Sequence, residues 1–76
     1  MDEALLHILP AMVDVAKIKR LRERRGLTQE QAAKKAGLGS RQRWNDIESG
    51  RKRSITVRTL EQMAGALEVS ARQLLK

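Results

Sequence analysis

The apolar residues of this chain recur mainly at intervals of three and four, which is the spacing of one face of an α-helix. The most regular series predicts a helix beginning after Thr56, with the core face Val57, Leu60, Met63, Ala64 and Leu67. A second series predicts a helix over residues 11–25, with one row of Ala11, Val15, Ile18 and Arg22 and with Leu21 beside it. Arg22 is a charge on a row that should be buried. It therefore needs a partner, because an unpaired buried charge costs several kcal/mol.

Between these two helices, residues 28–50 have the pattern of two short helices joined by a tight turn. Thr28 and Gln31 can form a capping box, in which each side chain accepts a hydrogen bond from the backbone N–H of the other residue. The small residues Ala32, Ala33 and Ala36 then form a face at helical spacing. Gly37 is expected to end this helix, since glycine adopts the left-handed conformation without steric cost.

The second of these helices, residues 41–49, follows a capping serine, Ser40, and is closed by Gly50. One side of it carries Trp44, Ile47 and Glu48, and the other sides carry Arg41, Gln42, Asn45 and Ser49. Two capped helices joined by a short glycine turn make a helix-turn-helix signature. The DNA major groove admits one helix, and Arg and Gln carry the paired donors and acceptors that distinguish base edges there. Arg41 and Gln42 stand at the end of the helix that this motif directs into the groove.

The two ends of the chain have their own patterns. Residues 1–13 form an extension whose large apolar residues include Leu5, Leu6, Ile8 and Leu9. Two short elements are expected to meet at Pro10, because proline interrupts a helix, and the extension either caps the core or forms a dimer contact. Residues 14–76 are the predicted DNA-binding domain. At its end, a second capping box of Ser70 and Gln73 predicts a last short helix that contains Ala71, Leu74 and Leu75.

The predicted fold is therefore all-α: a compact domain of five helices, without strands or long loops, preceded by an apolar segment. With 76 residues the chain can form one domain, whose core must come from aliphatic residues and one Trp. The sequence has no Cys, and His7 is its only histidine, so we expect neither a disulfide nor a metal site. It also lacks a glycine-rich phosphate loop and a nucleophile paired with a base, and we therefore expect neither an enzyme nor a cofactor.

No apolar run approaches the ~20 residues of a membrane span, and the acidic start lacks the basic region of a signal peptide. The expected location is therefore the cytoplasm.

The net charge of +7 is unevenly distributed. Residues 1–16 carry only acidic charges, a balance of −3, whereas residues 17–53 carry thirteen Lys and Arg against four carboxylates, a balance of +9. Such clustering is typical of a protein that binds a polyanion, although Lys and Arg can also merely solubilise helical faces. Arg51, Lys52 and Arg53 follow the second short helix directly, where phosphates would flank an inserted helix. The alternative for these three is a solvated loop.

Four segments between Ile18 and Leu75 carry a family pattern: IKxLRExRGLTQEQAAxxAG, WxDIExG, TLEQMAxAL, and V followed by LL. Together they resemble the lambda-repressor-like family of DNA-binding domains, which includes Cro, the phage repressors and the XRE type. The resemblance implies an inward salt bridge between Arg22 and Glu48, which would give Arg22 its partner. It also implies that Trp44 occupies a core position that is aliphatic in the family.

We predict two sets of DNA contacts, which combine positions carried over from the family with polar residues that flank the two short helices. The base-reading residues would be Arg41, Gln42, Asp46 and Asn45. The phosphate-binding residues would be Gln29, Thr28, Arg43, Ser49, Arg51, Lys52 and Arg53. Gln29 opens the first short helix, where free amides and the positive end of the helix dipole favour an anion. Asp46 can accept a hydrogen bond from cytosine but repels phosphate, so we interpret it as a residue that rejects wrong sites.

The chain departs from the family pattern in two places. One additional residue, supplied by Leu38 and Gly39, separates Gly37 from the second short helix. Ala32 stands where family members often have Leu, and the large Trp44 side chain is expected to fill the space that the smaller residue leaves.

We therefore expect a sequence-specific double-stranded DNA-binding transcriptional regulator of bacterial or phage origin, associated with the nucleoid and acting as a repressor that occupies its operator. One helix reads only a few base pairs, so a homodimer on a palindrome is expected. Its surface would be the N-terminal extension or the last helix with Leu74 and Leu75. The alternative is a protein-interaction module of the same fold, either an antitoxin bound to a toxin or a coactivator-type domain bound to a transcription protein.

Overall fold

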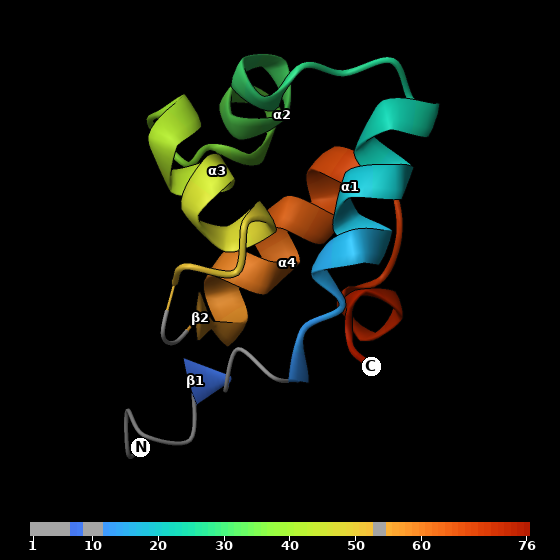
Figure 1. Ribbon diagram of the computed structural model, residues 1–76, viewed down its shortest axis with the longest axis vertical. Helices are drawn as coiled ribbons and strands as arrows, with labels where there is room; N and C mark the ends of the chain where they lie inside the picture. The colour runs from blue at the N-terminus through green and yellow to red at the C-terminus, as the bar shows by residue number, and fades with distance from the viewer. Residues whose placement is uncertain (1–6, 9–11, 53–54) are drawn as a thin grey trace.

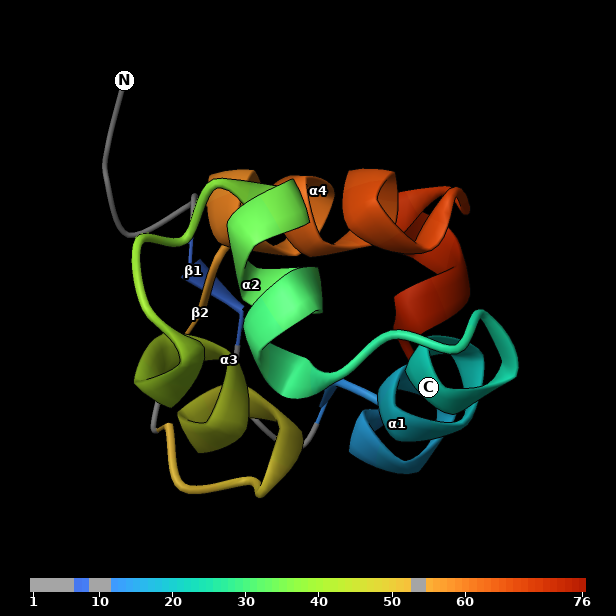
Figure 2. The ribbon, with the colours of Figure 1, turned by 90° about the horizontal axis from the view of Figure 1, so that it is seen from above.

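The computed structural model describes residues 7–8, 12–52 and 55–76. Its elements in chain order are β1 (His7–Ile8), α1 (Val15–Arg24), α2 (Gln29–Ala36), α3 (Arg41–Glu48), β2 (Ile55–Thr56), α4 (Val57–Leu67) and the 3₁₀ helix η3 (Ala71–Leu74). The helix α4 runs through the middle of the molecule, with α2 and α3 on one side of it and α1 on the other (Figure 1). Seen from above, α2 stands between α3 and α1, and it packs on both α3 and α4 (Figure 2).

A core of apolar side chains lies where these helices meet. Its largest fully buried members are Trp44, Ile18, Leu38, Leu60, Met63, Leu67, Leu74 and Val13. The core face predicted for α4 is confirmed: Leu60, Met63, Ala64 and Leu67 are buried, and Val57 is half-buried. The alanine face of α2 is also buried, which lets α2 pack closely against its two neighbours.

The helix predicted over residues 11–25 is shorter than expected, because it begins only after Asp14. The Oδ1 atom of Asp14 accepts a hydrogen bond from the backbone N–H of Lys17 at 3.1 Å and so caps the helix. Val13, the residue before this cap, pairs with Leu75 in an antiparallel β-bridge. Pairing with a distant segment thus replaces the first turn of the predicted helix.

The helix caps and the left-handed glycine predicted around the turn between α2 and α3 are confirmed. Thr28 Oγ1 accepts from the backbone N–H of Gln31 at 3.0 Å, and Gln31 Oε1 accepts from the backbone N–H of Thr28 at 2.9 Å, which completes the capping box. Gly37 ends α2 in the left-handed conformation, with φ of 73°. Ser40 caps α3 by accepting from the backbone N–H of Arg43 at 3.4 Å.

The prediction of a C-terminal capping box is wrong, although α4 does begin with a side-chain cap. Thr56 Oγ1 accepts from the backbone N–H of Thr59 at 3.1 Å at the start of α4. The Ser70 side chain makes no such bond; the backbone N–H of Gln73 donates instead to the Ser70 carbonyl at 3.0 Å. This bond spans three residues, as in a 3₁₀ helix. The described chain therefore has four α-helices and a short 3₁₀ helix, not five α-helices.

The prediction that the fold has no strands is also wrong. β1 and β2 form an antiparallel pair, with His7 opposite Thr56 and Ile8 opposite Ile55. Each strand has two residues, which is too short for the alternation by which a strand is recognised in a sequence.

The described residues of the N-terminal extension are joined to the rest of the chain by backbone hydrogen bonds. Besides the β1–β2 pair, the N–H of Lys76 donates to the carbonyl of Met12 and the N–H of Asp14 donates to that of Leu74, both at 2.9 Å. Residues 12–14 and 74–76 therefore run side by side. The predicted junction at Pro10 lies outside the described residues, as do Leu5, Leu6, Leu9 and Ala11.

Candidate nucleic-acid interface

The helix α3 divides into a buried side and an exposed side. Trp44, Ile47 and Glu48 are buried, and Trp44 is completely inaccessible to solvent. The residues on the outer side are Arg41, Gln42 and Arg43, which are exposed, Asn45 and Asp46, which are half-buried, and Ser49, which is exposed at the end of the helix. The polar residues predicted for DNA contacts therefore share one side of the helix, and apolar packing fixes the other side.

A buried carboxylate, that of Glu48, holds α3 against α1 and α2. The Arg22 guanidinium donates to it through Nε, at 3.2 Å to each oxygen, and through Nη2 at 3.1 Å to Oε1. Only 12% of the Arg22 side chain and 4% of the Glu48 side chain are exposed. The remaining guanidinium nitrogen, Nη1, donates to the carbonyl of Leu27 at 2.7 Å. The charge on the inner row of α1 is thus fully paired.

Two further donors reach the same carboxylate, and neither contact was predicted from the sequence. Gln29 Nε2 donates to Glu48 Oε2 at 2.7 Å, and Trp44 Nε1 donates to the same oxygen at 3.0 Å. Trp44 stands one helical turn before Glu48, so this bond could have been inferred from the four-residue spacing. The Gln29 contact joins two different helices and had no signal in the sequence. An aliphatic residue in place of Trp44 could fill space but could not donate this hydrogen bond.

The side chain of Gln29 is consequently turned toward the protein. Its amide nitrogen also donates to Asn45 Oδ1 at 3.1 Å, so that both of its N–H groups have acceptors on α3. The backbone amides at the start of α2 remain without acceptors inside the helix, as at any helix N-terminus. Thr28, just before them, is exposed.

The outer residues of α3 are also ordered by hydrogen bonds. Gln42 Nε2 donates to Asp46 Oδ1 at 2.8 Å, one turn further along the exposed side. Arg43 Nη1 donates to the carbonyl of Leu38 at 3.0 Å and thereby fastens the helix to the turn that precedes it. The additional residue in that turn is accommodated by Gly39, which has a φ of 85°.

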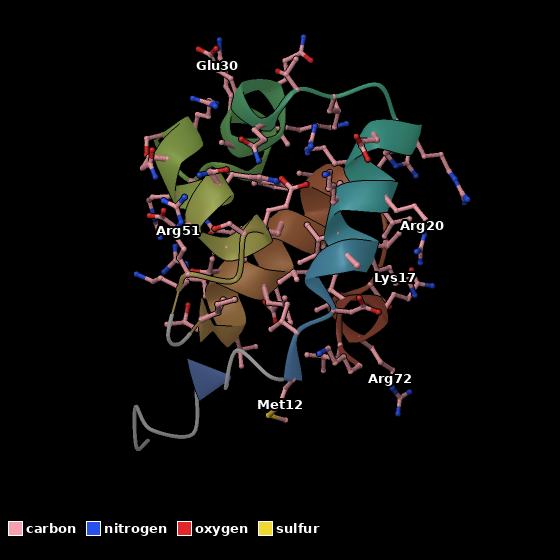
Figure 3. All side chains as sticks on the ribbon, in the orientation of Figure 1. Met12, Lys17, Arg20, Glu30, Arg51 and Arg72 are labelled. Atoms are coloured by element: carbon pink, nitrogen blue, oxygen red, sulfur yellow. The ribbon has the colours of Figure 1, made fainter. Side chains whose placement is uncertain are left out.

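A small cleft of about 200 Å³ lies beside α3, at its junction with the start of α4. Its lining residues are Arg43, Asp46, Ile47, Lys52, Ile55, Thr56 and Thr59. The backbone N–H of Lys52 donates to the carbonyl of Asp46 at 3.0 Å, which holds the residues after α3 close to that helix. Arg51 extends from the same segment, on the α3 side of the molecule (Figure 3). Arg53 lies outside the described residues.

Arg41, Arg43, Arg51 and Lys52, the cations around α3, form no ion pair with another described residue. Within residues 12–52 and 55–76, salt bridges join Arg22 to Glu48, and Arg25 and Lys35 to Glu68. None involves Arg41, Arg43, Arg51 or Lys52. This side of α3 therefore presents positive charge that is available to an anion, with Asp46 as the negative group among it. In the same ranges, no cluster of His, Cys, Asp and Glu has the arrangement of metal ligands.

Lys17 and Arg20, which precede the motif in sequence, do not share this side. Figure 3 shows Lys17 and Arg20 extending from α1 away from α3 and Arg51. The continuous basic segment of the sequence is therefore divided between two surfaces of the folded domain. Of the helices in the described part, none is long and apolar enough to cross a membrane.

Comparison with known families bears directly on this arrangement. A family model described as a helix-turn-helix domain matches residues 15–75, from the start of α1 to the end of η3. Searches of curated proteins and of solved structures found no significant match. The matched family binds DNA, regulates transcription and is typically not enzymatic. The chain therefore belongs to a helix-turn-helix family of the lambda-repressor-like, XRE type, as the sequence resemblance predicted.

Proposed function

We propose that this protein is a transcriptional repressor that occupies a palindromic operator as a homodimer, with α3 of each protomer in the major groove. The observation that supports this most is the division of α3. Its buried side is fixed by Trp44, Ile47 and the hydrogen-bonded Glu48 carboxylate, whereas its first turn presents exposed Arg41 and Gln42. A rigidly held helix with long polar donors at its N-terminal end is suited to reading base edges.

The proposed base-reading residues are Arg41, Gln42, Asn45 and Asp46. Arg can donate two hydrogen bonds to guanine, and Gln can pair with the edge of adenine. The hydrogen bond from Gln42 to Asp46 restricts the Gln42 side chain before DNA arrives, which lowers the entropy lost on binding. Asn45 is already oriented by Gln29, and its amide N–H groups remain for a base edge.

The proposed phosphate contacts surround α3. Arg43, Ser49, Arg51, Lys52 and Arg53 would bind the backbone beside the inserted helix, as cations and hydroxyls do in protein–DNA complexes. At the start of α2, Thr28 and Gln29 would bind a phosphate through the Thr28 hydroxyl and the Gln29 backbone amide. The Thr28 backbone amide already donates to Gln31, and the Gln29 side-chain amide is occupied by Glu48 and Asn45.

A homodimer follows from the number of base pairs that one helix can read, since two half-sites multiply the discrimination. The competing proposal is an antitoxin or coactivator-type module that binds another protein. It is favoured by Met12, which is 50% exposed and belongs to the N-terminal extension. A dimer contact at the same place would cover this residue equally well. The two proposals therefore differ in whether Met12 is covered by a second copy of this chain or by a different protein.

The test is to select duplexes from a randomised pool by their binding to the purified protein at moderate salt. Sedimentation of the protein with the most enriched duplex then gives the stoichiometry of the complex. The proposal expects an enriched palindrome, two protomers per duplex, and inhibition of transcription in vitro when the palindrome overlaps a promoter. Salt-sensitive binding without an enriched motif would overturn it and would leave the protein-interaction role as the better account.

A further inference from the structure

The outer face of α1 carries a row of cations that the operator contact does not use. Lys17, Arg20 and Arg24 are three and four residues apart, so they project from one side of the helix. The row is about 10 Å long at the helical rise of about 1.5 Å per residue. Arg20 and Arg24 are exposed, and Lys17 is half-buried. Figure 3 shows Lys17 and Arg20 on the side of the molecule away from α3, with Arg72 of η3 extending on that side as well.

Within the described ranges these cations form no ion pair, unlike two others on and next to the same helix. Arg22 is bound to Glu48, and Arg25 donates to Glu68 at 2.6 Å. No salt bridge in the described ranges involves the row, and Glu23, which is exposed on the same helix, forms none with it. Like charges one turn apart destabilise a helix slightly. An anion bound along the row would remove this repulsion.

The chemistry of the face favours phosphates over a protein partner. A protein interface has an apolar centre surrounded by polar groups. Among the described residues the only large hydrophobic that is exposed is Met12, which lies before α1 and, in Figure 3, apart from Lys17 and Arg20. Contacts to a nucleic-acid backbone need no apolar centre, since charge neutralisation and counterion release supply their free energy.

We propose that the outer face of α1 binds the phosphate backbone of a second DNA duplex without reading its sequence. A protomer that holds one duplex through α3 could then hold another through Lys17, Arg20 and Arg24, and so bring two DNA segments together. This inference rests on the proposed function only for the first of these contacts. The second contact depends on charge alone and is therefore strongly salt-dependent.

The test is a bridging assay. A duplex that carries the selected operator is fixed to beads, the protein is added, and retention of a labelled duplex of unrelated sequence is measured at several salt concentrations. The variant is Arg20→Gln/Arg24→Gln, in which both residues are exposed and free of salt bridges. The matched control is Lys34→Gln/Lys76→Gln, which removes the same charge from two other exposed positions.

We expect wild type and the control to retain the second duplex. The α1 variant should retain it roughly tenfold to a hundredfold less, because each lost phosphate contact removes about 0.9 from the salt slope. Its affinity for the bead-bound duplex should stay within about twofold. Equal retention by all three proteins, or none by wild type, would overturn the inference. A variant that also bound the first duplex more weakly, with a reduced salt slope, would place α1 on the operator and overturn it too. Failure of the proposed function would appear separately, as equal binding of operator and unrelated duplexes on the beads.

Discussion

Replacing Glu48 with glutamine tests whether the buried carboxylate holds α3 in place. In the native protein Oε1 accepts from Arg22, and Oε2 accepts from Arg22, Gln29 and Trp44. A glutamine turns one of these acceptors into a donor. Whichever way its amide is placed, an N–H group then faces another N–H group, and the buried Arg22 loses its counter-charge.

Removing one partner of a buried ion pair costs about 3–5 kcal/mol. A domain of this length is stable by only about 4–11 kcal/mol, so Glu48→Gln should lose a large part of its stability. The assay is urea denaturation followed by circular dichroism, with the m-value compared between proteins. The matched control is Glu68→Gln, since Glu68 pairs with Arg25 at the surface, where the side chains are 59% and 38% exposed. That change should cost less than about 1 kcal/mol. Equal losses in the two variants would refute the reasoning.

Three further predictions concern packing, capping and DNA contacts. Trp44→Ala should lower stability by about 3–5 kcal/mol, because Trp44 is completely buried, and an unchanged melting temperature would rule out its core role. Thr28→Ala should cost about 1 kcal/mol in urea denaturation, whereas Ser70→Ala should cost less than about 0.5 kcal/mol, because only Thr28 makes a side-chain cap; the reverse order would contradict the assignment. Lys52→Ala should weaken binding to all duplexes alike and lower the salt slope by about one, while Arg41→Ala should lose about 1–3 kcal/mol of binding free energy on the operator alone. Both are measured by fluorescence anisotropy. Identical behaviour of the two variants would show that base-reading and phosphate-binding residues are not distinct.

The parts of the fold that could be predicted are those determined by interactions within one or two helical turns. The capping box of Thr28 and Gln31, the cap of Ser40 and the left-handed Gly37 each involve residues at most three apart. The apolar face of α4 is equally local, because its spacing alone identifies the buried side. Such signals are read directly from a sequence, and they were sufficient to identify the helix-turn-helix motif.

The features that were missed depend on contacts between distant parts of the chain. The start of α1 is determined by the pairing of Val13 with Leu75, and β1 exists only because β2 lies beside it. The inward turn of Gln29 likewise depends on Glu48, nineteen residues away. At Ser70 the local signal was present but η3, with four residues, forms 3₁₀ bonds instead of a capped α-helix.

In the candidate site, too, local features could be predicted from the sequence and features that depend on the tertiary structure could not. Helical periodicity alone was sufficient to place Arg41 and Gln42 on the polar side of α3. It did not separate the cations of α1 from those around α3, because the relative direction of two helices is a tertiary property. Only the fold shows that Lys17 and Arg20 leave the molecule on the side away from Arg51.

The most direct test of the central claim, that α3 reads DNA sequence, is to repeat the randomised-pool selection with Gln42→Ala beside wild type. Gln42 is exposed on α3 and contributes nothing to the core, so the variant should fold normally. The account predicts the same palindrome and half-site spacing, with the preference relaxed at one base position in each half-site. An unchanged motif, obtained also with Arg41→Ala, would contradict it, because the first turn of α3 would then have no part in recognition.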